Sequence, residues 1–232
     1  MSSKNGTPLK QLTLNFGQKR PKTINCSECN IVYDPNDKED SQLHAKIHSE
    51  KEAVLKYTTL KGEKKVQEYS DGKCIVIEAG IDSKQLISKA IQVLEYVDTQ
   101  LGINSNENQT KFKDSAKVYL FYSYTAKKIV GVCLAEPIDK AYKIEYLNTE
   151  TKSFTLNESS CQKVLCGINR IWVASNMRRQ RVASRLLDCV RINFLYFRSL
   201  NLNDLAFSDP TEFGQALAKN YLQTDSFLIY NH

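Results

Sequence analysis

The sequence predicts an α+β protein in which a small Cys/His module precedes one mixed domain of strands and helices. Three observations predict this. Two cysteines and two histidines lie at ligand spacing within residues 26–48. From about residue 60, short β-branched runs alternate with long amphipathic helical patterns. The 232 residues suffice for one medium domain and an accessory module.

The bulk composition is that of an ordinary globular protein, with 41% apolar and 25% charged residues. No apolar run approaches the roughly 20 residues that span a bilayer, and the first ten residues lack the apolar stretch of a secretory signal. We therefore expect a cytosolic or nuclear protein with no membrane partner. Its seven irregularly placed cysteines are expected to be reduced thiols.

The first 23 residues are expected to form a disordered basic tail. Residues 1–25 contain five cations and no acid, so this segment carries five of the six excess positive charges. A basic tail favours an acidic partner surface or nucleic acid. On composition alone, a solvated arm is the simpler interpretation.

A zinc finger is predicted over residues 24–50. The pattern is Cys26-x2-Cys29-x14-His44-x3-His48. Zinc takes four nitrogen or sulfur ligands in a tetrahedron, and a CxxC knuckle with two histidines one helical turn apart supplies them. Because four protein ligands close the coordination shell, this Zn²⁺ is expected to be structural.

The finger does not carry the side chains expected of a DNA reader. If His44 is the seventh residue of the finger helix, the base-reading positions hold Asp37, Asp40 and Leu43. Two carboxylates would then face a polyanion, which is unfavourable. The sequence therefore favours a packing or protein-docking finger.

The remaining elements follow from periodicity and turn residues. A short charged helix or connector is expected at 49–58. Helices are expected at 83–101, 179–197 and about 213–222, the first with Ser83 as N-cap and Gly102 as its stop. The expected strands are 65–69, 74–78, 118–124, 129–135, 168–174, 205–207 and 227–230, with two or three weak strands in 139–166.

A pyrophosphate site is predicted where the strand Gly167–Val173 leads through a basic turn into the next helix. Free backbone N–H groups and the helix dipole attract an anion, and the nearby arginines add charge. The alternative is an exposed arginine cluster near a helix start. Cations there oppose the dipole unless an anion binds.

The motif Arg178-x-x-Arg181-x-Ala183 resembles the Gln/Arg-x-x-Gly-x-Gly/Ala loop of GCN5-related N-acetyltransferases. The segments GINRIWV, RRQRVASRLLD, AFSDPT and FLIY, together with the CxxC…HxxxH finger, resemble the cohesin acetyltransferases. The resemblance covers about residues 24–50 and 165–230. It departs at Arg181, where many acetyltransferases have glycine, and finds little to match in residues 142–166.

This resemblance implies a mixed-sheet GCN5-related N-acetyltransferase fold over residues 60–232 and acetyl-CoA as cosubstrate. It also implies that the backbone N–H near Val173 stabilises the thioester oxygen as charge develops on it. The implied cofactor-binding residues are Ile171, Trp172, Val173, Arg178, Arg179, Gln180, Arg181, Val182 and Ala183.

The resemblance also implies catalytic carboxylates that handle the substrate lysine. Asp209 is the first candidate and Asp188 the second, while Tyr221 is a candidate acid for the leaving thiolate. The substrate groove is expected to contain Asn169, Arg170 and Ser208. Other interpretations stay open: Asp209 as a helix cap, Asp188 as a surface residue, and Tyr221 and Trp172 as packing residues.

A cysteine nucleophile is disfavoured. Cys166 and Cys189 lie near the motifs, but no histidine is placed to activate them. The resemblance instead implies direct transfer of acetyl to a lysine of the cohesin SMC-type ATPase head, in the nucleus and on chromatin. The alternatives are an acetyltransferase of the same fold acting on another protein or amine, and a non-catalytic zinc-finger chromatin adaptor.

The tail carries a second recognisable pattern. Residues 11–16, Gln-Leu-Thr-Leu-Asn-Phe, resemble a motif that binds the replication sliding clamp, although Phe16 comes one residue early. Such short patterns also occur by chance.

Overall fold

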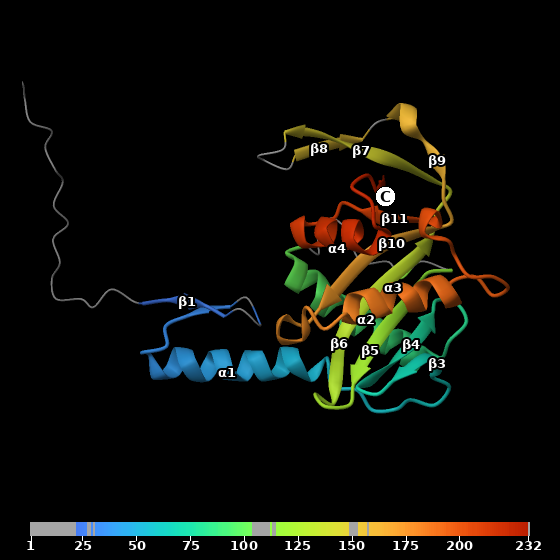
Figure 1. Ribbon diagram of the computed structural model, residues 1–232. Coiled ribbons are helices and arrows are strands. Elements are labelled where there is room, and N and C mark those ends of the chain that lie inside the picture. Colours follow the sequence, from blue (N-terminus) through green and yellow to red (C-terminus); the bar gives the residue numbers. More distant parts are fainter. Residues whose placement is uncertain are drawn as a thin grey trace, which may run out of the picture.

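The structure of the protein, a computed structural model, describes residues 22–26, 29, 31–103, 112, 115–148, 153–156 and 158–231 (Figure 1). The clamp-like residues 11–16 lie outside the described residues. In the described part of the chain, no helix is both long and apolar enough to cross a bilayer.

One mixed sheet forms the centre of the molecule, in the order β3-β4-β5-β6-β10-β11-β12-β7-β8, with β9 beside β7. Pairing is parallel from β10 to β12 and antiparallel elsewhere. Strands β1 (Ile24–Asn25) and β2 (Val32–Tyr33) form a separate hairpin. The sheet strands are β3 (Lys64–Tyr69), β4 (Gly72–Glu78), β5 (Lys117–Ser123), β6 (Lys128–Pro137), β7 (Lys140–Asn148), β8 (Ser153–Leu156), β9 (Gln162–Lys163), β10 (Cys166–Val173), β11 (Leu205–Ser208) and β12 (Leu228–Tyr230).

Helices α2 (Lys84–Leu101) and α3 (Val182–Asn193) cover opposite faces of this sheet (Figure 1). Alternation along β10 explains the arrangement, because successive side chains point to opposite faces. Trp172 packs toward α2, whereas its neighbours face α3. The helices are α1 (Lys38–Ala53), α2 (Lys84–Leu101), α3 (Val182–Asn193) and α4 (Glu212–Leu222), with short 3₁₀ turns at Glu158–Ser160, Ser175–Met177 and Leu202–Asp204.

The predicted caps of α2 are confirmed. The Ser83 hydroxyl accepts a hydrogen bond from the Leu86 N–H, and Gly102 ends the helix in the left-handed conformation with φ 73°. Both features are local consequences of the side chains present.

The helix expected at 179–197 is shorter than its apolar pattern, and this prediction was wrong at both ends. Arg179 and Arg181 adopt left-handed backbone with φ 64° and 61°, so α3 begins only at Val182. The helix ends at Asn193, before the exposed residues 196 and 197. The left-handed turn brings the arginines and the helix start to one place.

Helix α1 continues past the finger to Ala53 and is joined to the sheet domain. The Ile129 N–H donates to the Leu55 carbonyl at 2.8 Å, and Lys128 pairs with Glu52 at 2.9 Å. Lys89 of α2 donates to the carbonyls of residues 54 and 56. Figure 1 shows the finger projecting from this joint, to the left of the sheet domain.

The sheet opens between β10 and β11. Their parallel pairing runs only from Cys166 to Ile168, opposite Leu205 to Phe207. Beyond that point β10 continues to Val173 beside β6 alone. One edge of β10 therefore exposes backbone groups to the space that the split creates.

Candidate active site

A groove of about 770 Å³ occupies the split between β10 and β11 and extends to the starts of α3 and α4. It collects residues that lie far apart in the sequence. The sequence-predicted residues that line it are Asn169, Arg170, Ile171, Trp172, Val173, Arg178, Arg179, Arg181, Val182, Ala183, Ser208 and Asp209. Gln180, Asp188 and Tyr221 do not line it.

The start of α3 has the properties of an anion site. Its N-cap, Arg181, makes no side-chain capping hydrogen bond, and its first turn has no acidic residue. Val182, Ala183 and Ser184 all line the groove, so the uncapped first turn faces it. Unpaired N–H groups and the positive end of the helix dipole favour a phosphate here. The left-handed backbone of Arg181 also explains why glycine suits this position in related loops.

The Val173 N–H points into the groove. The N–H of the next residue, Ala174, donates to the Val130 carbonyl of β6 at 2.9 Å. Because backbone groups alternate along a strand, the N–H and C=O of Val173 point to the opposite edge. The Arg178 Nε reaches the Val173 carbonyl on that edge at 3.2 Å. The Val173 N–H therefore lies on the groove edge of β10 and stays a candidate oxyanion donor.

Asp209 lies exposed on the groove wall, at the turn between β11 and α4. Its φ of 21° falls in a region that few residues other than Gly, Asn and Asp adopt. The cap of α4 is Thr211, whose hydroxyl accepts from the Gly214 N–H at 3.3 Å. Asp209 is therefore not the helix cap, and it is an exposed residue that lines the groove.

Asp188 and Tyr221 form a pair between α3 and α4 that does not line the groove. The Tyr221 hydroxyl donates to the Asp188 carboxylate at 2.7 Å. Burial raises the pKa of the Tyr221 phenol well above its ordinary value, and the bond to Asp188 raises it further. This arrangement favours a structural role for the pair.

Arg170 lines the groove, but its guanidinium is held by contacts inside the domain. Its Nε pairs with Asp98 of α2 at 2.9 Å, and both side chains are nearly buried. It also donates to the Asn169 side-chain oxygen at 2.6 Å. Asn169 in turn accepts a hydrogen bond from the Ser208 hydroxyl at its backbone carbonyl, at 2.7 Å.

Glu136 contacts two groove-lining residues, a connection that the sequence did not reveal. It belongs to β6, is only 7% exposed, and accepts hydrogen bonds from Asn169 and Tyr230. Tyr230 lines the groove. Glu136 belongs to no recognisable sequence motif. Only the pairing of β6 with β10 brings it beside Asn169.

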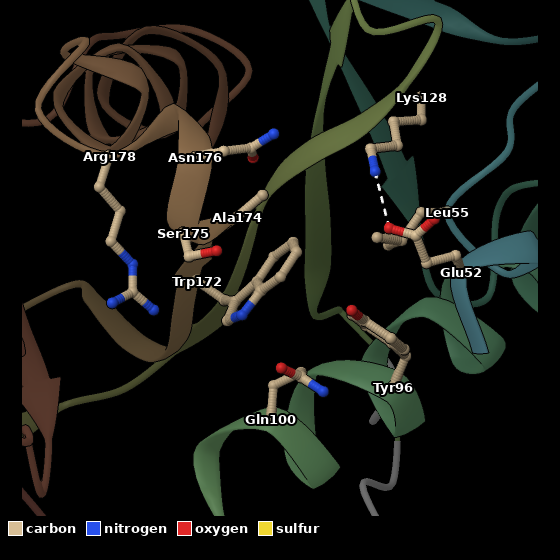
Figure 2. Close-up of a pocket in the computed structure, with 10 residues that line it drawn as sticks. All are labelled: Glu52, Leu55, Tyr96, Gln100, Lys128, Trp172, Ala174, Ser175, Asn176 and Arg178. Carbon is tan, nitrogen blue, oxygen red and sulfur yellow. Dashed lines mark hydrogen bonds and ion pairs between the residues drawn. The ribbon is translucent and has the colours of Figure 1, made fainter. Parts of the chain in front are cut away.

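Trp172 is chiefly a packing residue. Its indole is 6% exposed and contacts Tyr96 of α2 edge-on, with ring centroids 5.6 Å apart. Figure 2 shows it beside a second cavity, near the Lys128–Glu52 ion pair of the α1 joint. That cavity measures about 50 Å³, which is too small for a cofactor.

The two cysteines near the motifs are not placed for nucleophilic chemistry. Cys166 and Cys189 are buried, and neither lines the groove. Burial raises the pKa of the Cys166 thiol well above its ordinary value. A hydrogen bond with Cys74 lowers the pKa of the Cys189 thiol, but this thiol is buried outside the groove, so its placement agrees with direct transfer.

Three of the four predicted metal ligands form one cluster in the finger, and the fourth, His44, lies beside Cys29. The ligand atoms of Cys26, Cys29 and His48 all lie within 4.8 Å of one another, and the His44 Nε2 lies 3.3 Å from the Cys29 sulfur. Two thiolates and two imidazoles are the donor set of a structural zinc site. The residues present therefore fit Zn²⁺. The Tyr33 ring stacks on His44 at 3.8 Å and orients it.

The finger helix α1 starts at Lys38, which makes His44 its seventh residue. Two carboxylates of the finger accept hydrogen bonds from its own backbone. Asp37 caps α1 by accepting from the N–H groups of residues 39 and 40, and Asp40 accepts from the Asp34 N–H. The two acidic residues among the three predicted base-reading positions therefore stabilise the finger itself, which agrees with a non-reading finger.

Comparison with known proteins identifies the family. A family model described as ESCO1/2 acetyl-transferase matches residues 162–230, which include the groove-lining turn. A second, described as the zinc-finger of acetyl-transferase ESCO, matches residues 11–50. The chain belongs to the ESCO acetyltransferase family.

ESCO relatives and solved structures align along most of the chain. It is 35% identical to N-acetyltransferase ESCO1 of Homo sapiens, over 97% of this chain and 28% of that protein. It is 35% identical to N-acetyltransferase ESCO2 of Danio rerio, over 95% of this chain and 37% of that protein. The chain thus spans roughly a third of the length of these relatives.

The ESCO fold is also seen in solved structures. The xEco2 acetyltransferase domain bound to a K105-CoA conjugate is 37% identical and superposes with a TM-score of 0.66, covering 73% of this chain and 99% of that one. This likeness confirms the predicted mixed-sheet acetyltransferase fold.

We expect the finger to hold one zinc ion that stabilises it. Replacing Cys29 with alanine removes a buried ligand, so metal content should fall from about one ion per chain to near zero. Elemental analysis of the purified protein measures this. Cys161, which is exposed and outside the finger, gives a matched Cys→Ala control that should keep its zinc. Wild-type protein without zinc would contradict the assignment.

Proposed function

We propose that this protein is an acetyl-CoA-dependent lysine N-acetyltransferase, with residues 24–50 as its zinc finger and residues 60–232 as its catalytic domain. The observation that carries the proposal is the groove. It joins an uncapped helix start, an inward-pointing backbone N–H and an exposed carboxylate in one continuous space. A CoA conjugate bound to the related xEco2 domain supports the same ligand class.

The arginine-rich turn and the first turn of α3 would hold the cofactor pyrophosphate. Arg178, Arg179 and Arg181 surround this end of the groove, and backbone N–H groups of α3 complete the site. Acetyl-CoA, when bound, supplies the acetyl group as a thioester. The Val173 N–H would donate to the carbonyl oxygen as negative charge develops there.

Asp209 would act on the incoming lysine. A free lysine amine has a pKa of about 10.4, so nearly all of it is protonated and unreactive at neutral pH. A carboxylate on the groove wall attracts the ammonium ion, orients it and accepts a proton directly or through water. In the described residues, no hydrogen bond or ion pair engages the Asp209 side chain, which leaves it available to substrate.

The substrate we propose is a lysine in the cohesin SMC-type ATPase head, acetylated in the nucleus to establish sister-chromatid cohesion. Membership in the ESCO family supports this choice. The test is incubation of the protein with labelled acetyl-CoA and purified cohesin heads, followed by mass-spectrometric mapping of the label. We expect label on a head lysine.

The same experiment separates the alternatives. Label on another added protein or amine, with none on the heads, indicates an acetyltransferase of different specificity. A chain that fails to bind acetyl-CoA in calorimetry is a zinc-finger adaptor, and the proposed activity is then wrong.

We further propose that residues 11–16 recruit the replication sliding clamp. The Gln…Leu…Phe pattern in a basic segment supports this. Replacing Leu14 and Phe16 with alanine should abolish clamp binding in a pull-down and leave acetylation of free substrate unchanged. Equal clamp binding by this double variant would refute the assignment.

A further inference from the structure

Glu136 occupies an unusual place for a carboxylate. It lies inside the sheet, 7% exposed, directly beside the split that forms the groove. Its Oε1 accepts a hydrogen bond from the Asn169 amide at 2.7 Å and another from the Tyr230 hydroxyl at 2.8 Å. Burying a carboxylate is costly unless hydrogen bonds compensate it, so this position calls for a functional explanation.

Asn169 connects Glu136 to the groove wall. It is the extra residue of a β-bulge, because Ile168 pairs with Ala135 and Arg170 with Leu134 of β6, while Asn169 has no partner in that register. Bulges re-aim side chains and are frequent beside active sites. Here the bulge lets the Asn169 side chain meet Glu136 while its carbonyl faces β11.

Ser208 completes the connection to Asp209. Its hydroxyl donates to the Asn169 carbonyl at 2.7 Å, just beyond the last backbone pair between β10 and β11. Ser208 also pairs with Tyr230 of β12, whose hydroxyl donates to Glu136. Glu136 is thus connected to Ser208, the residue before Asp209, through Asn169 and also through Tyr230.

The network is held rigidly at its other end. Arg170 bonds both oxygens of Asn169, at 2.6 and 3.0 Å, and is itself paired with Asp98. The Tyr230 ring lies against Gly167, where an added Cβ would come within 2.5 Å of it. Asn169 and Tyr230 therefore have little freedom to move, which suits a support for a catalytic turn.

We propose that Glu136 is a positioning residue that holds the Ser208–Asp209 turn in its productive geometry through Asn169 and Tyr230. This inference rests on the proposed function, in which Asp209 meets the substrate lysine. Glu136 does not itself line the groove, so it acts through its partners. Displacing a catalytic group by about 1 Å can cost on the order of a hundredfold in rate.

The test compares two substitutions in the full chain, with purified cohesin heads and acetyl-CoA as substrates. Glu136→Met removes both acceptors at similar volume, and kcat should fall by about tenfold to a hundredfold. Glu136→Gln keeps an acceptor oxygen and should recover most of this loss. The acetyl-CoA Kd, measured by calorimetry, should stay within about twofold in both, because none of Glu136, Asn169 and Tyr230 belongs to the arginine turn or to the first turn of α3.

A control variant, Glu78→Gln, and a double-mutant cycle with Asp209→Asn distinguish a loss of positioning from a general loss of fold stability. Glu78 is a second buried glutamate that accepts a tyrosine hydrogen bond, from Tyr196 at 2.6 Å, but it lies away from the groove. Glu78→Gln should lower Tm and leave kcat unchanged. In an Asp209→Asn background, Glu136→Met should change the residual kcat by less than about twofold.

The outcomes separate this inference from the proposed function. An unchanged kcat in Glu136→Met, or an equal loss with and without Asp209, overturns the positioning role. If Glu136→Met does not fold, Tyr230→Phe removes one of the two donors and should lower kcat several-fold, with no change overturning the inference. A wild-type kcat in Asp209→Asn alone instead refutes the assigned base, whatever Glu136 does.

Discussion

Asp209→Asn should lower kcat by at least about a hundredfold, because loss of a general base typically costs about 10²–10⁴ in rate. The substitution keeps the size and turn-forming ability of the side chain but removes the charge that we propose attracts and deprotonates lysine. Acetyl-CoA affinity should barely change, since the carboxylate lies on the α4 side of the groove and the cofactor turn precedes α3. Steady-state kinetics and calorimetry measure the two effects.

The stability of Asp209→Asn gives an independent check. A lost helix cap costs about 1 kcal/mol, but the cap of α4 is Thr211. The free energy of unfolding should therefore change by less than that amount. Asp225→Asn is a matched control, because this exposed aspartate lies beyond the other end of α4. If Asp209→Asn acetylates at the wild-type rate, Asp209 is structural and Asp188 becomes the leading candidate despite its bond to Tyr221.

Ala183→Asp should abolish acetyl-CoA binding while the fold stays intact. Ala183 lies in the first turn of α3 and lines the groove, so a carboxylate there would face the cofactor phosphates. Two like unit charges about 4 Å apart near a protein surface repel by about 4 kcal/mol. The Kd should then rise by at least about a hundredfold. Calorimetry measures the affinity, and circular dichroism verifies the fold.

Ala183→Ser separates charge from size in this experiment. It adds one polar atom without a charge, and helix starts accept serine readily. Its acetyl-CoA affinity should stay near that of the wild type. An Ala183→Asp protein that also binds normally would place the pyrophosphate elsewhere in the groove.

The sequence by itself determined the features that depend on neighbouring residues. Ser83 and Gly102 could be recognised as the two ends of α2, because capping needs only a side-chain oxygen at the start or a left-handed residue at the end of a helix. The finger ligands were recognisable because zinc requires a fixed ligand set at short spacings. The order of the sheet-domain elements followed from apolar periodicity, which reports burial on one face of a helix or strand.

Only the tertiary structure decided which polar residues share a site. Asp188 and Asp209 were both candidates by sequence, but one bonds Tyr221 between two helices and the other faces the groove. Glu136 carried no signal, because strand pairing between β6 and β10 brings it to Asn169 across 33 positions of sequence. Likewise, the left-handed backbone of Arg179 and Arg181 shortened α3 against its apolar pattern. Periodicity reports which side of an element is buried, whereas strand pairing and the packing of α3 and α4 decide which side chains meet.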